Sequence, residues 1–224
     1  MADFGTQRLN MVESQVRPSD VTDRRLMHAM LDLPRELFVP DWGRAVAYAD
    51  ENVPVSHGTS RLASRTLLAP RTLAKLIQSA EIQVGDRVLD IACATGYSSA
   101  VLSRLADEVV GLEEDTVLAA AARETLQFLK ISNVRIEQGA LAQGWPAGAP
   151  YDVILMNGGL SDVPHGLLSQ VKDGGRLACI LSRAGRFGTA QVHTKRGASV
   201  GSRIVFDAWA PGLPGFEAAP VFSF

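Results

Sequence analysis

The chain has 224 residues, of which 46% are hydrophobic and 21% are charged. A chain of this length and composition can bury a substantial core and fits one elaborated domain better than two full ones. The formal net charge of -2 excludes a globally basic protein, so we expect no nucleic-acid partner. No apolar run approaches the ~18 residues that span a bilayer, so we also expect no membrane partner.

The cysteines and histidines give no sign of a metal site. Cys93 and Cys179 lie in apolar surroundings without the spacing of metal ligands, so we expect reduced, buried thiols. A thiol at a helix N-terminus, as at Cys93, can have a lowered pKa, but a small apolar filler is the favoured interpretation. The four histidines are scattered. No basic segment followed by an apolar one opens the chain, and we expect a cytoplasmic protein.

The first part of the chain, residues 1–80, is predicted to be helical. Asp20 or Thr22 can cap a helix that ends before Pro34. A second helix begins at Pro70. Between them, the stretch 48–64 is rich in Ser, Thr, Gly and His and predicts a loop that could serve as a lid or a partner surface.

The second part, residues 81–224, alternates between strand and helix patterns. Apolar runs predict strands at 87–91, 108–113, 134–138, 152–156 and 176–181. Helical periodicity predicts helices at 98–105, 117–129 and around 164–171. This alternation is typical of an α/β protein with a doubly wound, mostly parallel sheet. Beyond residue 191 we expect an antiparallel edge and then a packed tail that ends at Phe222 and Phe224.

A turn follows the first predicted strand, where many nucleotide-binding domains carry the glycine-rich pattern D-x-G-x-G-x-G. Here Asp90 and Gly96 are kept, but Ala92 and Ala94 replace the first two glycines. If the turn keeps the positive φ that glycine allows, each alanine costs about 1–2 kcal/mol of strain. Otherwise the backbone must take another path, and either outcome weakens ligand binding.

Glu113 ends the next strand, 23 residues after Asp90. A carboxylate at that place suits hydrogen bonds from ribose hydroxyls, and the spacing of the turn favours an adenosyl ligand over a dinucleotide. The alternative is that Asp90 merely caps the turn and Glu113 is a solvated strand end.

Two blocks of sequence are specific in their order and spacing: PRELFVP at 34–40 and GYSSAVL at 96–102. Shorter matches lie at 11–12, 47–50, 88–91, 151–154 and 174–177. Through them, residues 10–182 resemble the protein-L-isoaspartate O-methyltransferase family. The resemblance implies a Rossmann-like S-adenosylmethionine-dependent methyltransferase fold. It implies a cytoplasmic, monomeric protein-repair enzyme whose methyl acceptor is an isoaspartyl-containing peptide or protein.

The resemblance also implies site residues. Cofactor contacts are implied for Asp90, Ala92, Ala94, Gly96, Tyr97, Glu113, Gly139 and Ala140. The family places an aspartate that faces the adenine where this chain has Gly139 and Ala140. Thr66 is implied to lie nearest the acceptor, while Leu68 stands where the family has a serine. The loop 56–64 is roughly six residues longer than the family pattern.

Methyl transfer to a carboxylate needs no general base, because a carboxyl with a pKa near ~4 is ionised at pH 7. The protein must hold two groups at near-attack distance and exclude water. Without the serine at position 68, the acceptor carboxylate lacks one hydrogen bond, at about 1.5–3 kcal/mol, unless Ser60, Ser64 or Thr66 donates instead.

Two hypotheses follow. The first is an S-adenosylmethionine-dependent carboxyl methyltransferase; the second is a methyltransferase-fold protein that has lost catalysis and acts as a binding or assembly module. Such a module would use the loop 56–64 or a basic C-terminal edge. No acidic residue lies between Gly174 and Phe206, while the basic residues there are Arg176, Arg183, Arg186, Lys195, Arg196 and Arg203. The alternative for this edge is an ordinary solvated sheet.

Overall fold

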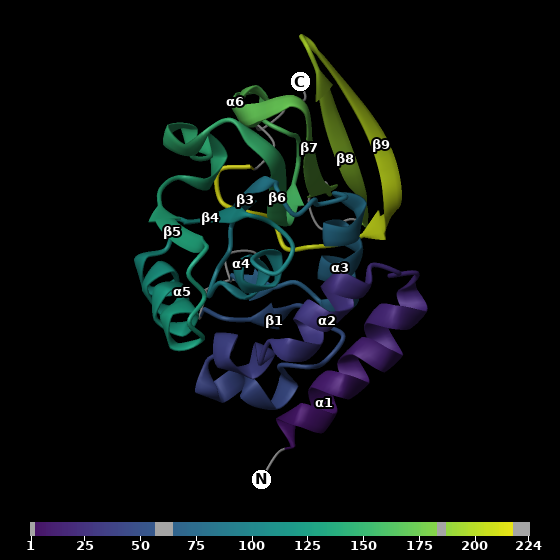
Figure 1. Ribbon diagram of the computed structural model, residues 1–224, viewed down its shortest axis with the longest axis vertical. Coiled ribbons are helices and arrows are strands. Elements are labelled where there is room, and N and C mark those ends of the chain that lie inside the picture. The colour runs from purple at the N-terminus through teal and green to yellow at the C-terminus, as the bar shows by residue number, and fades with distance from the viewer. Residues whose placement is uncertain (1–2, 57–64, 183–186, 217–224) are drawn as a thin grey trace, which may run out of the picture.

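The computed structural model describes residues 3–56, 65–182 and 187–216 (Figure 1). Some of the sequence-based expectations concern residues outside these ranges. They are the expectations for most of the loop 56–64, for two of the basic residues and for the end of the tail. Those residues are His57, Ser60, Ser64, Arg183, Arg186, Phe222 and Phe224.

A seven-stranded sheet forms the centre, in the order β5-β4-β3-β6-β7-β8-β9. Its strands are β3 (Arg87–Ile91), β4 (Glu108–Glu113), β5 (Val134–Gln138), β6 (Tyr151–Leu160), β7 (Val171–Leu181), β8 (Gly188–Arg196) and β9 (Ser199–Ala208). The pairs from β5 to β7 are parallel, and the pairs β7–β8 and β8–β9 are antiparallel. The predicted doubly wound sheet with an antiparallel edge is therefore confirmed. Its direction of winding reverses between β3 and β6, which is where such sheets bind ligands.

Four helices accompany the sheet: α3 (Pro70–Ser79), α4 (Tyr97–Leu102), α5 (Thr116–Phe128) and α6 (His165–Gln170). Side chains that alternate along β3 pack into two separate hydrophobic cores, one on each face of the sheet. Val88 joins the core that contains residues of α3, α4 and α5, whereas Leu89 and Ile91 join the core that contains Leu167 of α6. Strands 87–91, 108–113 and 134–138 have the predicted bounds; β6 continues beyond its predicted end and β7 begins before its predicted start.

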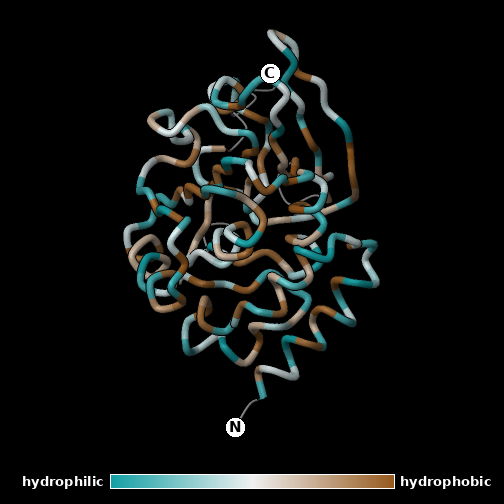
Figure 2. Tube along the Cα trace, in the orientation of Figure 1, coloured by the Kyte–Doolittle hydropathy of each residue, from teal (hydrophilic) through white to brown (hydrophobic). Residues whose placement is uncertain are grey.

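The N-terminal part is helical, as predicted, and lies at the end of the molecule opposite the projecting tip of the β8–β9 hairpin (Figure 1). It comprises α1 (Phe4–Met11), a π-helical turn (Val12–Val16), α2 (Arg24–Asp32) and three 3-10 turns (Arg17–Ser19, Arg35–Phe38 and Asp41–Val46). Its coils alternate between hydrophilic and hydrophobic positions along the chain (Figure 2), as in helices that bury one face. The division of the chain at residue 80 stays a prediction.

The predicted cap of α2, the helix that ends before Pro34, is wrong. Asp23 caps α2, and its carboxylate accepts hydrogen bonds from the amides of Arg25 and Leu26 at 2.8 and 3.3 Å. The amide of Thr22 donates instead to the side chain of Gln78 in α3, at 2.6 Å. This contact to a distant helix holds Thr22 outside α2, so the helix begins after Asp23.

Candidate functional site

The turn from Asp90 to Gly96 connects β3 to α4 at the edge where the winding of the sheet reverses. Ala92, Ala94 and Gly96 have φ angles of 63°, 51° and 92°. The turn thus keeps the glycine-like path in spite of its two alanines, which is the strained outcome of the two considered above. Both alanines are buried, and the amide of Ala92 donates to the carbonyl of Leu112 in β4 at 2.8 Å. Packing and hydrogen bonding hold the strained backbone in place.

Asp90 lies fully buried beneath this turn. Its carboxylate accepts hydrogen bonds from Ser98 and Ser99 of α4, at 2.7 and 2.6 Å, and from Asn157 of β6, at 2.6 Å. Burial raises the pKa of Asp90 to about 6, although the three hydrogen bonds act in the opposite direction. Asp90 therefore joins α4 to β6 as well as supporting the turn. Asn157 was not predicted as a site residue. Its place after a predicted strand that lies parallel to β3 could have indicated it.

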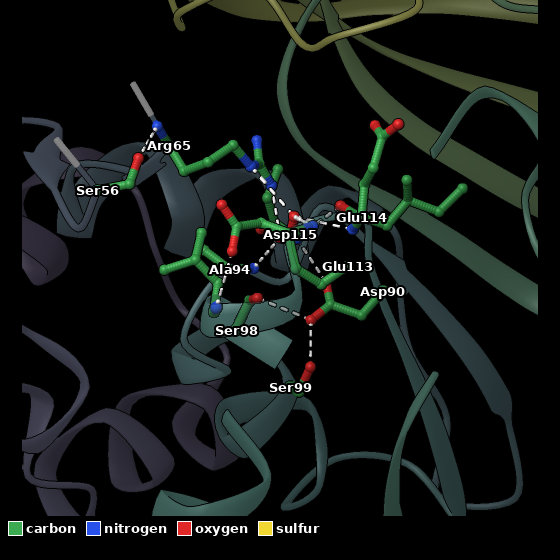
Figure 3. A network of polar contacts seen from close by, with 12 residues as sticks. Ser56, Arg65, Asp90, Ala94, Ser98, Ser99, Glu113, Glu114 and Asp115 are labelled. Atoms are coloured by element: carbon green, nitrogen blue, oxygen red, sulfur yellow. Dashed lines mark hydrogen bonds and ion pairs between the residues drawn. The ribbon is translucent and has the colours of Figure 1, made fainter. Parts of the chain in front are cut away.

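Glu113, at the end of β4, is buried and not a solvated strand end (Figure 3). One carboxylate oxygen, Oε2, accepts from the amide of Ala94 and from Nη2 of Arg65, both at 2.8 Å. The other, Oε1, accepts from the amides of Glu114 and Asp115 at 2.9 and 3.2 Å, and from Nε of Arg65 at 3.4 Å. Every donor belongs to the protein itself, so the carboxylate proposed for ribose hydroxyls is already engaged.

Arg65 is a further residue of this site that was not singled out from the sequence. It precedes Thr66 and reaches from the N-terminal part into the edge of the sheet (Figure 3). Its side chain is 9% exposed and that of Glu113 is 1% exposed, so the ion pair is almost entirely removed from water. Its backbone is also held, because its amide donates to the hydroxyl of Ser56 at 2.9 Å.

The segment 66–69, which the resemblance places near the acceptor, begins with strand β2 (Thr66–Leu67), paired with β1 (Val53–Pro54). Arg35, from the PRELFVP block, is fully buried and donates to the carbonyls of Leu68 and Ala47 at 2.9 and 2.7 Å. Burial lowers its pKa, and its guanidinium lies 4.6 Å from the centre of the Tyr97 ring. Arg35 thus fixes the segment next to the turn.

Two hollows border this segment. A cavity of about 10 Å³ lies against Thr66, Leu68, Ala92 and Tyr97, whereas a surface groove of about 700 Å³ begins at Ala69. The small cavity has room for about one water molecule, while sites for small ligands usually measure roughly 300–1,000 Å³. The residues of the turn therefore lie together beside the acceptor segment, and Arg65 occupies the carboxylate of Glu113 next to them.

The large groove runs between α3 and the carboxyl end of β9. Six of its lining residues are Asn52, Ala69, Arg71, Lys75, Phe206 and Trp209. The amide of Ala69 donates to the side chain of Asn52 at 2.9 Å. The ammonium of Lys75 lies 4.6 Å from the centre of the Phe206 ring. The groove thus offers aromatic, cationic and amide groups directly beside the acceptor segment.

Gly139 and Ala140 follow β5. The amide of Gly139 donates to the carbonyl of Glu113 at 3.1 Å, and a Cβ at Gly139 would lie 3.5 Å from the ring of Trp145. Ala140 is exposed. Gly139 thus lies beside Glu113, and neither Gly139 nor Ala140 has a side chain that can accept a hydrogen bond from an adenine.

The basic edge is partly occupied by internal contacts. Arg176 pairs with Asp86 at 2.6 Å and Arg203 with Glu81 at 3.0 Å. Lys195 donates to main-chain carbonyls, one of them that of Val171 at 2.7 Å. Since these three cations already have partners, their contacts favour the solvated-edge interpretation.

Both cysteines are buried free thiols. Burial raises the pKa of Cys93 well above its ordinary value, and the nearby carboxylates of Asp90 and Glu113 act in the same direction. The notion of a lowered pKa at this helix N-terminus is therefore wrong, because desolvation outweighs the helix end. Within the described ranges, no cluster of three or more histidine, cysteine or acidic side chains could hold a metal ion. No helix there is long and apolar enough to cross a membrane.

Comparison with known proteins decides the family. The family model described as protein-L-isoaspartate(D-aspartate) O-methyltransferase matches residues 7–206. The chain belongs to this family. Protein-L-isoaspartate O-methyltransferase 1 of Rhodopseudomonas palustris is 38% identical over 174 residues, which cover 78% of this chain and 69% of the relative. The protein-L-isoaspartate O-methyltransferase of Opitutus terrae is 37% identical over 190 residues, covering 85% and 79%.

Solved structures of the isoaspartate methyltransferase family share the fold. One protein-L-isoaspartate O-methyltransferase superposes with a TM-score of 0.82 at 25% identity, covering 94% of this chain and 67% of that one. A Plasmodium falciparum protein, solved in complex with S-adenosyl-L-homocysteine, superposes with a TM-score of 0.76 at 20% identity, covering 92% and 97%. The expected Rossmann-like methyltransferase fold is confirmed.

Proposed function

We propose that this protein is an S-adenosylmethionine-dependent carboxyl methyltransferase that acts on isoaspartyl residues of peptides or proteins. Membership of the family supports this function, and the two relatives named above carry the name of that activity. The observation that carries it is the backbone of the turn 90–96. The turn has positive φ at Ala92, Ala94 and Gly96, the three glycine positions of the nucleotide-binding pattern, so the ligand-binding path of the backbone persists.

We assign cofactor contacts to the residues that the resemblance implies: Asp90, Ala92, Ala94, Gly96, Tyr97, Glu113, Gly139 and Ala140. Asp90 acts by holding the first turn of α4 and the end of β6 together. Glu113 supplies the carboxylate at the end of β4, and its bond from the Ala94 amide couples it to the turn.

The acceptor polypeptide lies in the groove that begins at Ala69. Thr66 is the hydroxyl-bearing residue of the adjacent segment, and Leu68 cannot donate a hydrogen bond. Since the acceptor carboxylate is already ionised at neutral pH, the side chains position it and exclude water and need not remove a proton. Although Asp50, Glu51 and Asp207 also line the groove, the ammonium of Lys75 can pair with the acceptor carboxylate, and the rings of Phe206 and Trp209 can pack against the peptide.

One observation favours a second candidate, a methyltransferase-fold protein without catalysis that acts as a binding module. The Arg65–Glu113 ion pair occupies the carboxylate that the ribose of an S-adenosyl ligand would need. The two candidates differ in one property, which is whether an S-adenosyl ligand binds at all.

We also propose that the protein is a monomer, to which the family resemblance points, and that it is cytoplasmic, with which the two buried free thiols agree.

The test is methyl transfer from labelled S-adenosylmethionine to an isoaspartyl peptide, beside the same peptide with an ordinary aspartyl residue. The proposed function predicts incorporation into the isoaspartyl peptide alone. Equal labelling of both peptides would contradict the proposed acceptor, and no labelling of either would support the second candidate.

A further inference from the structure

We propose that Arg65 sets the affinity of this protein for S-adenosyl ligands by occupying Glu113 in their place. The ligand binds when the guanidinium of Arg65 leaves that carboxylate. This inference rests on the proposed function, because it concerns the ligand of the same site. It adds a residue that controls binding and that lies outside the glycine-rich turn.

The carboxylate of Glu113 has no free position for a further hydrogen bond while Arg65 is bound to it. A carboxylate offers about four lone-pair positions, and Glu113 already accepts five hydrogen bonds. Three of the donors are main-chain amides, which are fixed by the turn after β4 and by the turn 90–96. The other two are Nε and Nη2 of Arg65. Since a ribose diol needs positions on this carboxylate, the arginine is the partner that a ligand can replace.

The positive charge of Arg65 also competes with the positive charge of the ligand. An S-adenosylmethionine sulfonium is positive, and the nearest buried carboxylates to the turn are Asp90 and Glu113. While Arg65 is paired with Glu113 at 2.8 Å, its positive charge cancels that of the carboxylate. Removing the guanidinium therefore restores negative charge where the cationic ligand is expected.

A motion of the Arg65 side chain alone is sufficient to free the carboxylate of Glu113. The backbone of Arg65 is fixed, because its amide donates to Ser56 and its carbonyl accepts from the amide of Val55, both at 2.9 Å. Its guanidinium, by contrast, makes its described hydrogen bonds to Glu113. Rotation about the long side chain frees the carboxylate while the adjacent segment at Thr66 stays in its strand.

The experiment is calorimetric titration of S-adenosylmethionine into the native protein and into Arg65→Ala. Arg65→Gln serves as a second variant that keeps a polar group beside Glu113 should the alanine variant fold poorly. Arg17→Ala is the control, since Arg17 forms an exposed ion pair with Glu13. We expect at least tenfold tighter binding for both Arg65 variants, unchanged binding for Arg17→Ala, and no gain from Arg65→Ala when Glu113→Gln is also present.

The outcomes separate this inference from the proposed function. Equal or weaker binding by the Arg65 variants, in a native protein that binds measurably, overturns the inference and leaves the methyltransferase intact. No binding by any variant at millimolar ligand overturns both. A gain in affinity from Arg65→Ala that persists when Glu113→Gln is also present overturns the inference as well. Arg65 would then hinder the ligand by its size and not by competing for this carboxylate.

Discussion

The amide of Ala94, a residue with φ of 51°, donates to the carboxylate of Glu113 at 2.8 Å. This bond joins the strained turn after β3 to the last residue of β4 and places the carboxylate directly against the turn. The same carboxylate receives Arg65. The turn, the carboxylate and the arginine therefore behave as one unit, and substitution at any of them changes the environment of the other two.

The left-handed backbone at Ala94 predicts an unusual tolerance of glycine. Ala94→Gly loses a buried methyl group but relieves about 1–2 kcal/mol of strain, so we expect a change in unfolding free energy within about 0.5 kcal/mol. Ala119 in α5 is equally buried but helical, and Ala119→Gly should cost about 1–2 kcal/mol. Urea denaturation of the two variants measures the difference; equal losses would contradict strain at Ala94.

Leu68→Ser tests the acceptor segment. If a hydroxyl at position 68 contacts the acceptor carboxylate, the variant should gain about 10- to 100-fold in kcat/KM, corresponding to about 1.5–3 kcal/mol. It should also lose about 2–4 kcal/mol of stability, because Leu68 is buried. Leu67→Ser is the matched control, since the neighbouring leucine is also buried. A similar change of rate in both variants would argue against a role for position 68.

Arg35 is predicted to position the acceptor segment through the carbonyl of Leu68. Arg35→Met keeps much of the volume but leaves two buried carbonyls without their donor, so we expect a loss of about 2–4 kcal/mol in unfolding free energy. In the folded variant, KM for the peptide should rise more than kcat falls, because the segment is displaced while the turn remains. Thermal denaturation and steady-state kinetics measure the two effects, and a stability like that of the native chain would refute the burial argument.

The pKa of Asp90 gives a pH dependence with a definite sign. Its pKa of about 6 in the folded chain lies above the ordinary value of 3.8, so between these two pH values the native state binds more protons than the unfolded state. The contribution of Asp90 to stability is therefore present at low pH and is lost as the pH rises through about 6. Relative to Asp90→Asn, the native chain should lose stability from pH 4 to pH 6 and then level off. Chemical denaturation across this range checks the sign, and the opposite trend would show a depressed pKa.

The local elements were predictable from sequence where neighbouring residues decide them. The strands at 87–91, 108–113 and 134–138 are short apolar runs between turns, and the structure gives them the same bounds. Residues 1–80 were predicted to be helical, but no bounds were predicted for α1, because Met11 is its one buried residue and no apolar stripe marks it. The start of α2 was misplaced because a contact with Gln78, far along the chain, decides it.

The candidate site was predictable only where a turn and the ends of strands mark it in the sequence. Asp90 and Glu113 were predicted because their spacing and strand ends are visible there. Arg65, Arg35 and Asn157 were missed because each acts on a partner that is 48, 33 or 67 residues away. Such contacts depend on how the N-terminal part and the sheet pack together, which no local pattern records.

The central claim is that this chain transfers methyl groups to isoaspartyl residues. The most direct measurement is methyl ester formation on an isoaspartyl peptide and on its aspartyl counterpart, with the native chain and with Arg65→Ala, over S-adenosylmethionine concentrations that reach saturation. The account predicts ester on the isoaspartyl peptide alone, with a lower KM for S-adenosylmethionine in the variant. No ester from either protein, each verified as folded, would contradict it.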